Sequence, residues 1–197
     1  MQETDLHYPP EACPFCGIAA AYPMRDTGLW RKEEEVADAV PGEEECGVEK
    51  TSPSSFLVMR TRDVVAFLDI LPMTGGHLLV ATRNHRVKVA DMEAQESREI
   101  GFWLPLLART VAKVTGVTDY NIVQNNGARA AQVVPHVHFH IIPRPATKPE
   151  IKSRSWTMFG RGQRDDLDDE EGAQMASEMR KVLRQEIEKL GKSSPRL

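Results

Sequence analysis

Three of the six histidines in this 197-residue chain alternate with apolar residues at positions 136–140, in the order His-Val-His-Phe-His. β-branched and aromatic residues at alternate positions predict a β-strand, whose successive side chains point to opposite faces of a sheet. All three imidazoles are therefore predicted on one face. Such a face can bind a metal ion, or it can use an imidazole as nucleophile or base. An exposed strand that is merely histidine-rich is the third interpretation.

An amide-rich segment lies upstream of these histidines. Asn125, Asn126 and Gly127 stand together, and Gln132 lies between them and His136. Side-chain amides and open backbone N–H groups suit a phosphate that gains negative charge in its transition state. The neighbouring residues therefore favour phosphoryl chemistry at one of the imidazoles.

A cysteine pair, Cys13 and Cys16, lies near the N-terminus in the sequence Cys-Pro-Phe-Cys-Gly. No strand is predicted before Cys13, so the pair favours a structural zinc site over redox chemistry, with a reduced, empty turn as the alternative. A structural zinc ion needs four ligands. Cys46 lies in an acidic segment and is interpreted as incidental, so His85 and one histidine of residues 136–140 are the predicted completion.

Short β-prone runs and one long amphipathic stretch predict an α+β fold. The apolar periodicity predicts a helix from an N-cap at Asp91 to Thr115, which ends at Gly116 and is kinked by Pro105. The predicted strands span residues 56–59, 64–68, 77–81, 120–124 and 137–142. The first three of them predict an antiparallel meander.

Composition predicts one folded domain with two additions. Residues 1–150 form the predicted domain, in which residues 25–54 are rich in acids and are interpreted as an inserted, mobile surface loop. Residues 151–197 form a C-terminal extension with an amphipathic helix. Before that helix, Trp156 and Phe159 are expected to pack on the core, against the sheet or a dimer partner, with contact of Arg161 and Arg164 to a polyphosphate as the alternative. Residues 1–24, which carry the cysteine pair among several prolines, are interpreted as a loop.

Net charge gives no general basis for binding nucleic acid or an anionic membrane, because 25 basic residues face 29 acidic ones. No apolar run is long enough to span a membrane, and acids stand where a signal peptide needs bases. The expected location is the cytoplasm, with the nucleus as a second compartment. Neither a membrane nor a nucleic acid is expected as a partner.

The residues at 136–142 resemble the His-x-His-x-His-x-x motif, with x apolar, of the histidine triad nucleotide hydrolases and transferases. Residues 66–70, 75–80 and 125–127 resemble the flanking sequences of this family, in the same order. The resemblance implies a five-stranded antiparallel sheet with helices, commonly paired as a homodimer. It also implies binding of a purine nucleoside monophosphate and transfer of a nucleotidyl group to histidine, then to water.

The resemblance assigns roles residue by residue. His138 would attack the α-phosphorus, and His140 would hydrogen-bond the phosphate or the leaving group. Asp69 would hold the ribose hydroxyls, and Asn125 would reach the phosphate or leaving group. His77 would be a buried, hydrogen-bonded histidine that supports the sheet.

The zinc-bearing members of this family complete a cysteine pair with two histidines. That pattern corresponds to Cys13, Cys16, His85 and His136 here. The resemblance therefore supplies the two histidines that the ligand count requires, and it makes His136 a structural residue.

One departure from the family lies just before the triad. The family usually has Gly-Gln-Ser or Gly-Gln-Thr where this chain has Ala131, Gln132 and Val133. Loss of the hydroxyl removes a hydrogen bond to phosphate that contributes about 1.5 to 3 kcal/mol. Gln132 or backbone amides are therefore the candidates for contacting the substrate in its place.

The function predicted from these residues is hydrolysis of adenosine 5′-phosphoramidate or a related AMP adduct, through a covalent histidine–AMP intermediate that releases AMP. Cleavage of dinucleoside polyphosphates is the first alternative. A nucleotide-binding scaffold with little turnover is the second, because Ala131 and Val133 depart from the family pattern. Repair of adenylylated DNA ends fits less well, because the net charge is negative.

Overall fold

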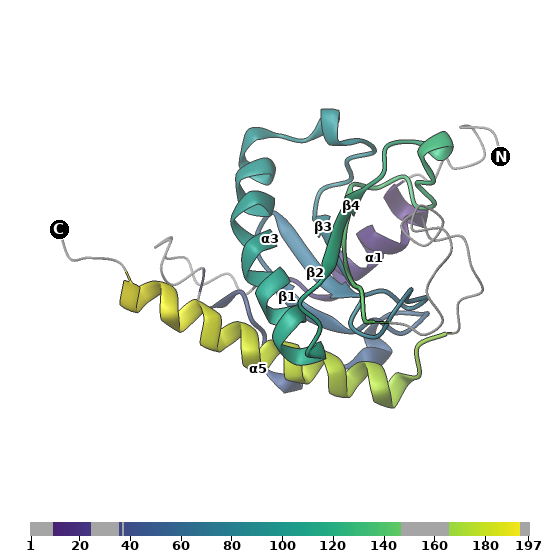
Figure 1. The fold of residues 1–197 in the computed structure, drawn as a ribbon. Helices are drawn as coiled ribbons and strands as arrows, with labels where there is room; N and C mark the ends of the chain where they lie inside the picture. Colours follow the sequence, from purple (N-terminus) through teal and green to yellow (C-terminus); the bar gives the residue numbers. More distant parts are fainter. Residues whose placement is uncertain (1–9, 25–35, 37, 147–165, 194–197) are drawn as a thin grey trace.

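A computed structural model describes residues 10–24, 36, 38–146 and 166–193, and it contains one five-stranded antiparallel sheet (Figure 1). The order of the strands across the sheet is β1-β2-β3-β5-β4. The strands are β1 (Leu57–Arg60), β2 (Val64–Leu68), β3 (Leu78–Thr82), β4 (Tyr120–Gln124) and β5 (His138–Pro143). The predicted α+β architecture is confirmed, with strand boundaries shifted by at most one residue.

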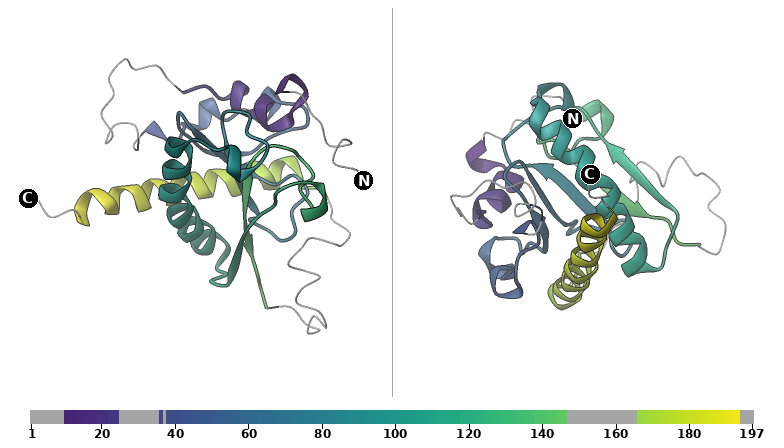
Figure 2. Two further views of the ribbon diagram at one scale, coloured as in Figure 1. Left: turned by 90° about the horizontal axis from the view of Figure 1, so that it is seen from above. Right: turned by 90° about the vertical axis from the view of Figure 1, so that its left-hand side faces the viewer.

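Helices cover both faces of the sheet. Helix α1 (Pro14–Ala21) lies on one face, while α3 (Ala94–Thr115) and α5 (Asp169–Ser193) lie on the other (Figures 1 and 2). The side chains of β2 and β3 are all buried, because alternate residues enter the two apolar layers. Phe67 and Leu79, for example, lie on the α1 side, whereas Ala66 and Val80 lie on the α3 side.

The long helix begins two residues later than the predicted N-cap at Asp91 implies. Val89–Asp91 forms a short 3-10 turn, and Glu93 is the residue that precedes α3. The Glu96 carboxylate accepts a hydrogen bond from the Glu93 N–H at 2.7 Å, so a capping box begins the helix. The predicted end is confirmed, since Gly116 adopts a left-handed φ of 69°.

The N-terminal cysteine segment is a helix, and the interpretation of this region as a loop was wrong. Cys13 precedes α1, Pro14 occupies its first turn, and the Gly17 N–H donates to the Cys13 carbonyl at 3.0 Å. Proline is favoured at the start of a helix because its missing N–H is not needed there. The Phe15 side chain is buried, which anchors this short helix to the sheet.

The acidic segment is more than a surface loop in the part that the structure describes. Residues 38–54 contain two short 3-10 helices, Glu43–Glu45 and Val48–Lys50. The side chains of Ala39, Val40 and Cys46 are buried, so burial holds this part against the sheet. Residues 25–35 and 37 lie outside the described residues.

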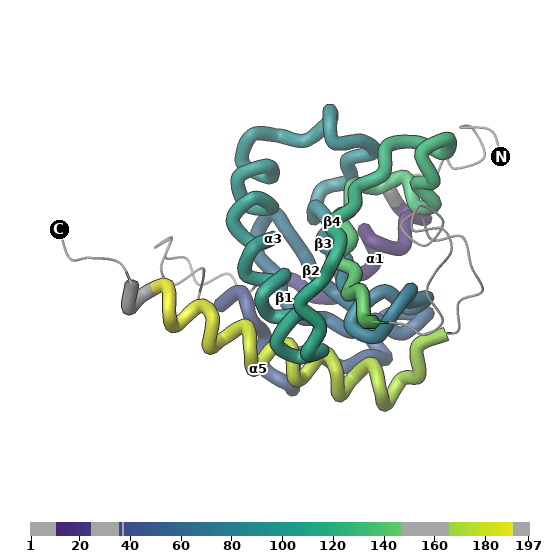
Figure 3. The backbone as a smooth tube through the Cα atoms, viewed as in Figure 1, coloured from purple at the N-terminus to yellow at the C-terminus, as the bar shows by residue number. Residues whose placement is uncertain are grey.

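The predicted C-terminal amphipathic helix is confirmed as α5, which runs beside β1 and α3 (Figure 3). Ala176, Met179 and Leu183 are buried in the common core. Trp156 and Phe159, which were expected to pack on the core, lie outside the described residues. Among the described helices, none is long and apolar enough to cross a membrane.

Candidate functional site

A cavity of about 510 Å³ opens on the α1 face of the sheet, above the middle of β5. His138 and His140 project from β5 into its lining, and their ring centroids lie 4.8 Å apart. Phe15 of α1 and Phe67 of β2 also line it. The alternation of β5 places these two imidazoles on one face, as predicted, whereas His136, which was predicted on the same strand, precedes β5 and does not line the cavity.

His138 has one ring nitrogen committed to the backbone. Its Nδ1 lies 2.6 Å from the His136 carbonyl oxygen, so Nδ1–H donates and Nε2 carries the lone pair. Burial lowers the pKa of His138, which keeps the ring neutral at pH 7. The edge of Phe15 packs against the ring with centroids 5.0 Å apart. A neutral imidazole held in this tautomer is suited to act as a nucleophile through Nε2.

His140 belongs to a chain of polar groups that continues beneath the cavity. His77 Nε2 lies 3.0 Å from His140 Nδ1, and the Met73 N–H donates to His77 Nδ1 at 3.2 Å. With Nδ1 accepting, His77 Nε2–H donates to His140, which leaves the proton of His140 on its Nε2. His77 is only 1% exposed, as expected for a buried, hydrogen-bonded residue.

Asp69 lies at the start of this chain and also lines the cavity. Its Oδ1 accepts a hydrogen bond from the Leu71 N–H at 2.9 Å, and its Oδ2 lies 3.3 Å from His77 Nδ1. The Asp69 carboxylate therefore lies beside the same ring nitrogen of His77 that receives the Met73 N–H. The sequence indicated Asp69 as a ribose ligand but not its contact with His77, because only the turn between β2 and β3 brings them together.

The loop before the histidine triad contributes different residues to the cavity than the sequence predicted. Asn125 lines the cavity, as do Ala131 and Val133, whereas Gln132 does not. The buried Gln132 amide accepts from the Gly127 N–H at 2.6 Å and donates to the Val87 carbonyl at 2.7 Å. The prediction that Gln132 contacts the substrate is therefore corrected: its amide is used to hold the loop.

The four predicted metal ligands converge beside α1. One ligand atom each from Cys13, Cys16, His85 and His136 lies within 4.8 Å of all the others. His136 Nδ1 lies 3.4 Å from Cys13 Sγ, and His85 Nδ1 lies 3.3 Å from Cys16 Sγ. Tetrahedral zinc with ordinary Zn–S and Zn–N bonds separates sulfur from nitrogen by about 3.6 Å. The donor set and its spacing therefore fit zinc.

The protonation chemistry of this cluster also suits a cation. Burial, together with the nearby Cys13 sulfur, raises the pKa of Cys16 to about 12. Burial lowers the pKa of His136 to about 4, so this imidazole is neutral at pH 7. Two adjacent thiolates become favourable when a divalent ion balances their charge, and neutral imidazoles complete such a site.

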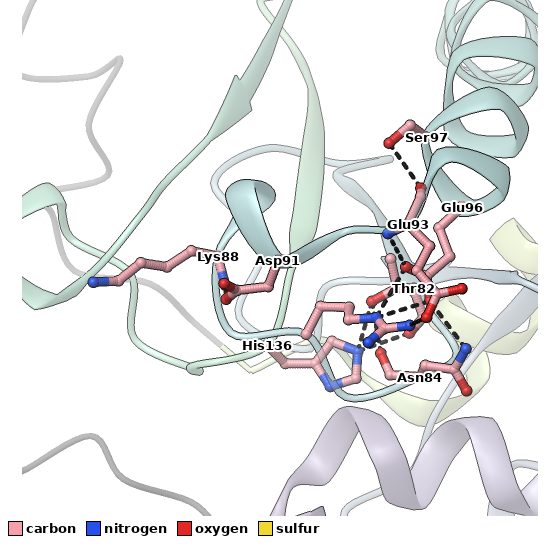
Figure 4. A network of polar contacts seen from close by, with 9 residues as sticks. Thr82, Asn84, Lys88, Asp91, Glu93, Glu96, Ser97 and His136 are labelled. Carbon is pink, nitrogen blue, oxygen red and sulfur yellow. Dashed lines mark hydrogen bonds and ion pairs between the residues drawn. The ribbon is translucent and has the colours of Figure 1, made fainter.

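Hydrogen bonds orient the two histidines of this cluster. His136 Nε2 donates to the Thr82 carbonyl at 2.7 Å (Figure 4). Its Nδ1 is thereby turned toward the two sulfurs. His85 lies between Asn84 and Arg86, and both neighbours donate to the buried Glu96 of α3 at 2.9 Å. Such outer contacts set the tautomer and orientation of metal-binding histidines.

The five-stranded sheet, the paired imidazoles and the cysteine–histidine cluster together define a class of α+β fold with a histidine-lined cavity. Residues 50–147 match the family model described as the HIT domain. An uncharacterized HIT-like protein from Methanocaldococcus jannaschii is 38% identical over 115 residues, which cover 57% of this chain and 83% of that protein. The chain belongs to the histidine triad, or HIT, family.

Two further likenesses bear on function and fold. The adenosine 5′-monophosphoramidase hnt1 of Schizosaccharomyces pombe is 46% identical over 81 residues, which cover 41% of this chain and 58% of that protein. The chain thus spans less than two thirds of that relative. The crystal structure of a Zn-bound histidine triad family protein from Mycobacterium smegmatis superposes with a TM-score of 0.59 at 21% identity, covering 94% of this chain and 100% of that one. This second likeness establishes the shared fold.

Proposed function

We propose that this protein hydrolyses adenosine 5′-phosphoramidate or a related AMP adduct and releases AMP. The observation that carries the proposal is the orientation of His138, whose Nδ1–H bond to the His136 carbonyl leaves Nε2 at a nucleotide-sized cavity beside His140. The similarity to a named adenosine 5′-monophosphoramidase supports the choice of substrate.

The proposed reaction has two steps. His138 Nε2 attacks the α-phosphorus, a nitrogen–phosphorus bond forms, and the bond to the leaving amine breaks as the amine takes a proton from water, with His140 Nε2–H hydrogen-bonded to the leaving group. The hydroxide so formed attacks the same phosphorus, the bond to His138 breaks, and AMP leaves as the His138 ring is restored. Asn125 would contact the phosphate, and Asp69 would accept hydrogen bonds from the ribose hydroxyls.

Zinc is proposed as a structural ion held by Cys13, Cys16, His85 and His136. When bound, it would cross-link α1 to the turn after β3 and to the segment that leads into β5. The His136 carbonyl that holds His138 belongs to a ligand of this site. The proposed zinc site would therefore fix the backbone on which the nucleophile depends.

The function is tested by measuring AMP release chromatographically from adenosine 5′-phosphoramidate and from a diadenosine polyphosphate, with wild type and His138→Ala. We expect AMP from the phosphoramidate, lost in the variant, at an unchanged melting temperature. Preference for the dinucleotide would instead assign the polyphosphate hydrolase activity. AMP binding without turnover of either compound would support the scaffold.

The covalent step needs its own measurement. Rapid quenching with a labelled adenylyl substrate should trap an acid-labile adduct, and peptide mapping should locate it on His138. An adduct on His136 or His140 would contradict the assigned nucleophile.

A homodimer is proposed from the edge of the sheet. Strand β4 pairs only with β5 among the described strands, and its Tyr120 and Ile122 side chains are more than two fifths exposed. Apolar side chains on a strand edge favour pairing with another chain. Sedimentation of wild type and Ile122→Lys tests this, and a wild-type monomer would refute it. Cytoplasmic and nuclear location is proposed as well, and fractionation of cells that express the chain checks it.

A further inference from the structure

One carboxylate outside the cavity holds the segment that carries His85. The Glu96 side chain of α3 is 2% exposed, and its Oε1 accepts a hydrogen bond from Asn84 Nδ2 at 2.9 Å. Its Oε2 accepts from Arg86 Nε at 2.9 Å and from the Glu93 N–H at 2.7 Å. Three donors therefore converge on a buried group that neither lines the cavity nor belongs to the four predicted metal ligands.

These donors keep Glu96 ionised. Burial by itself raises the pKa of this carboxyl, but the hydrogen bonds from the Glu93 N–H, Arg86 and Asn84 more than offset that effect, so the pKa lies below its ordinary value. A buried charge is stable in a protein only where such partners compensate it. The site is thus built for a carboxylate, and an amide of the same shape would satisfy fewer of the donors.

Residues 82–86, which we call the ligand segment, follow β3 and are bonded at both ends to the chain that leads into β5. At its first residue, the Thr82 carbonyl accepts a hydrogen bond from His136 Nε2 at 2.7 Å. At its last residue, the Arg86 carbonyl accepts from the Val137 N–H at 2.6 Å. The ligand segment therefore fixes one histidine ligand through its backbone.

The other histidine ligand belongs to the ligand segment itself. His85 lies between Asn84 and Arg86, whose side chains are both held by Glu96 (Figure 4). Its Nδ1 lies 3.3 Å from Cys16 Sγ. Because one carboxylate fixes the residues on both sides of His85, the backbone there has little freedom to move away from the sulfur.

We propose that Glu96 is a positioning residue for the metal site and strengthens zinc binding by holding the ligand segment in the geometry that the ion requires. The inference rests on the proposed zinc site. A segment that is already held in place loses little conformational freedom when the ion binds, so more of the free energy of ligation is expressed as affinity. Contacts to the neighbours of metal ligands typically change metal affinity by about 10- to 100-fold.

The test measures the zinc affinity of the full chain by competition with a chromophoric chelator. We expect Glu96→Ala to bind zinc at least tenfold more weakly than wild type. Glu96→Gln keeps the shape of the side chain and one accepting oxygen, so it should recover part of that loss. Cobalt(II) in place of zinc provides a spectroscopic signature, because the intense d–d bands of a tetrahedral site should weaken in Glu96→Ala if His85 is displaced.

Two further variants separate positioning from the stability of α3, because Glu96 also begins this helix. Ser97→Gly, at an exposed position, weakens the same helical turn and leaves the Glu96 carboxylate in place. Its zinc affinity should stay within twofold of wild type. Asn84→Ala leaves the hydrogen bond between Glu96 and the Glu93 N–H intact and removes one donor, so it should weaken zinc binding at least threefold even if Glu96→Ala does not fold.

The outcomes distinguish this role from the zinc site on which it rests. Equal losses of zinc affinity in Glu96→Ala and Ser97→Gly, or unchanged affinity in Glu96→Ala and Asn84→Ala, would overturn the role of Glu96 and leave the zinc site supported. A wild-type chain that binds neither zinc nor cobalt would contradict the zinc site and the role of Glu96 together.

Discussion

Two clusters of histidines meet at the start of β5, and they differ in which ring nitrogen is available. His136 donates its Nε2–H to the Thr82 carbonyl and turns Nδ1 toward two sulfurs. His138, two positions later, donates its Nδ1–H to the His136 carbonyl and keeps Nε2 for the cavity. A backbone carbonyl decides the tautomer in each case.

The contrast explains how similar residues acquire different chemistry. The ring of His136 is fully buried beside Cys13 and Cys16, where a neutral imidazole completes a metal site. The ring of His138 lines a cavity that can hold substrate. Position relative to α1, rather than residue type, therefore separates ligand from nucleophile.

The largest expected effect comes from exchanging these two histidines for alanine. We expect His138→Ala to lower AMP release at least about a thousandfold, because removal of a nucleophile abolishes the covalent route. Its zinc content and melting temperature should stay close to wild type. His136→Ala should lose bound zinc, measured by elemental analysis.

Equal loss of zinc in both variants would remove the distinction between the two clusters. Wild-type turnover by His138→Ala would also contradict this distinction, because the cavity histidine would then have no chemical role.

Chelation of zinc should have the next largest effect. Free zinc at a thousand times its dissociation constant stabilises a folded chain by about 4 kcal/mol. For a chain of this size that corresponds to a fall of roughly 8 to 16 °C in melting temperature on adding a chelator, followed by calorimetry.

The third cysteine provides a matched control. Cys46 is buried, and its Sγ donates to the Gly42 carbonyl at 3.2 Å, outside the four-residue cluster. Cys46→Ala should keep one zinc per chain and its response to chelator, whereas Cys16→Ser should lose both. Wild-type protein prepared without chelator that contains no zinc, and that does not gain stability from added zinc, would refute the site.

Asp69→Asn tests how the cavity cluster differs from the metal cluster. Removing a charged hydrogen-bond acceptor for the ribose should raise KM about tenfold in steady-state kinetics, with kcat within threefold. Zinc content should not change. A fall in kcat at constant KM would mean that Asp69 acts mainly through His77, which lies 3.3 Å away.

The smallest expected effect concerns the loop before the triad. Ala131 adopts a left-handed φ of 63°, a conformation in which its Cβ is strained. Ala131→Gly should raise the free energy of unfolding by about 0.5 to 1 kcal/mol in urea titrations, since relief of strain exceeds the entropy gained by the unfolded chain. Zinc affinity should be unaffected. A loss of stability would show that the alanine side chain contributes packing that outweighs its strain.

Local patterns were sufficient to predict much of this arrangement. The alternation at 136–140 predicted a strand with its imidazoles on one face, and the cysteine pair predicted a need for two histidines. The structure brings those four ligands together. The helix at residues 14–21 was missed because its prolines and glycine suggested a loop, whereas the burial of Phe15 stabilises it against the sheet.

Gln132 shows why a residue type near a site is a weak guide to its use. Its amide could equally bind phosphate or backbone, and only the folded loop brought Gly127 and Val87 within hydrogen-bonding distance. The position of residues 50–55 was missed for a similar reason. These hydroxyl-rich residues suggest a surface turn, and contacts with Tyr22 and α5 place them at the cavity.

The sequence by itself determined the strands, the amphipathic helices and the chemical inventory of imidazoles and thiols, because periodicity and ligand chemistry act over a few residues. The tertiary structure decided which ring nitrogen each histidine presents, which amide remains available and where the acidic segment ends. Those outcomes depend on carbonyls, carboxylates and helices distant in the chain. Their positions become defined only when the sheet is paired and both of its faces are covered.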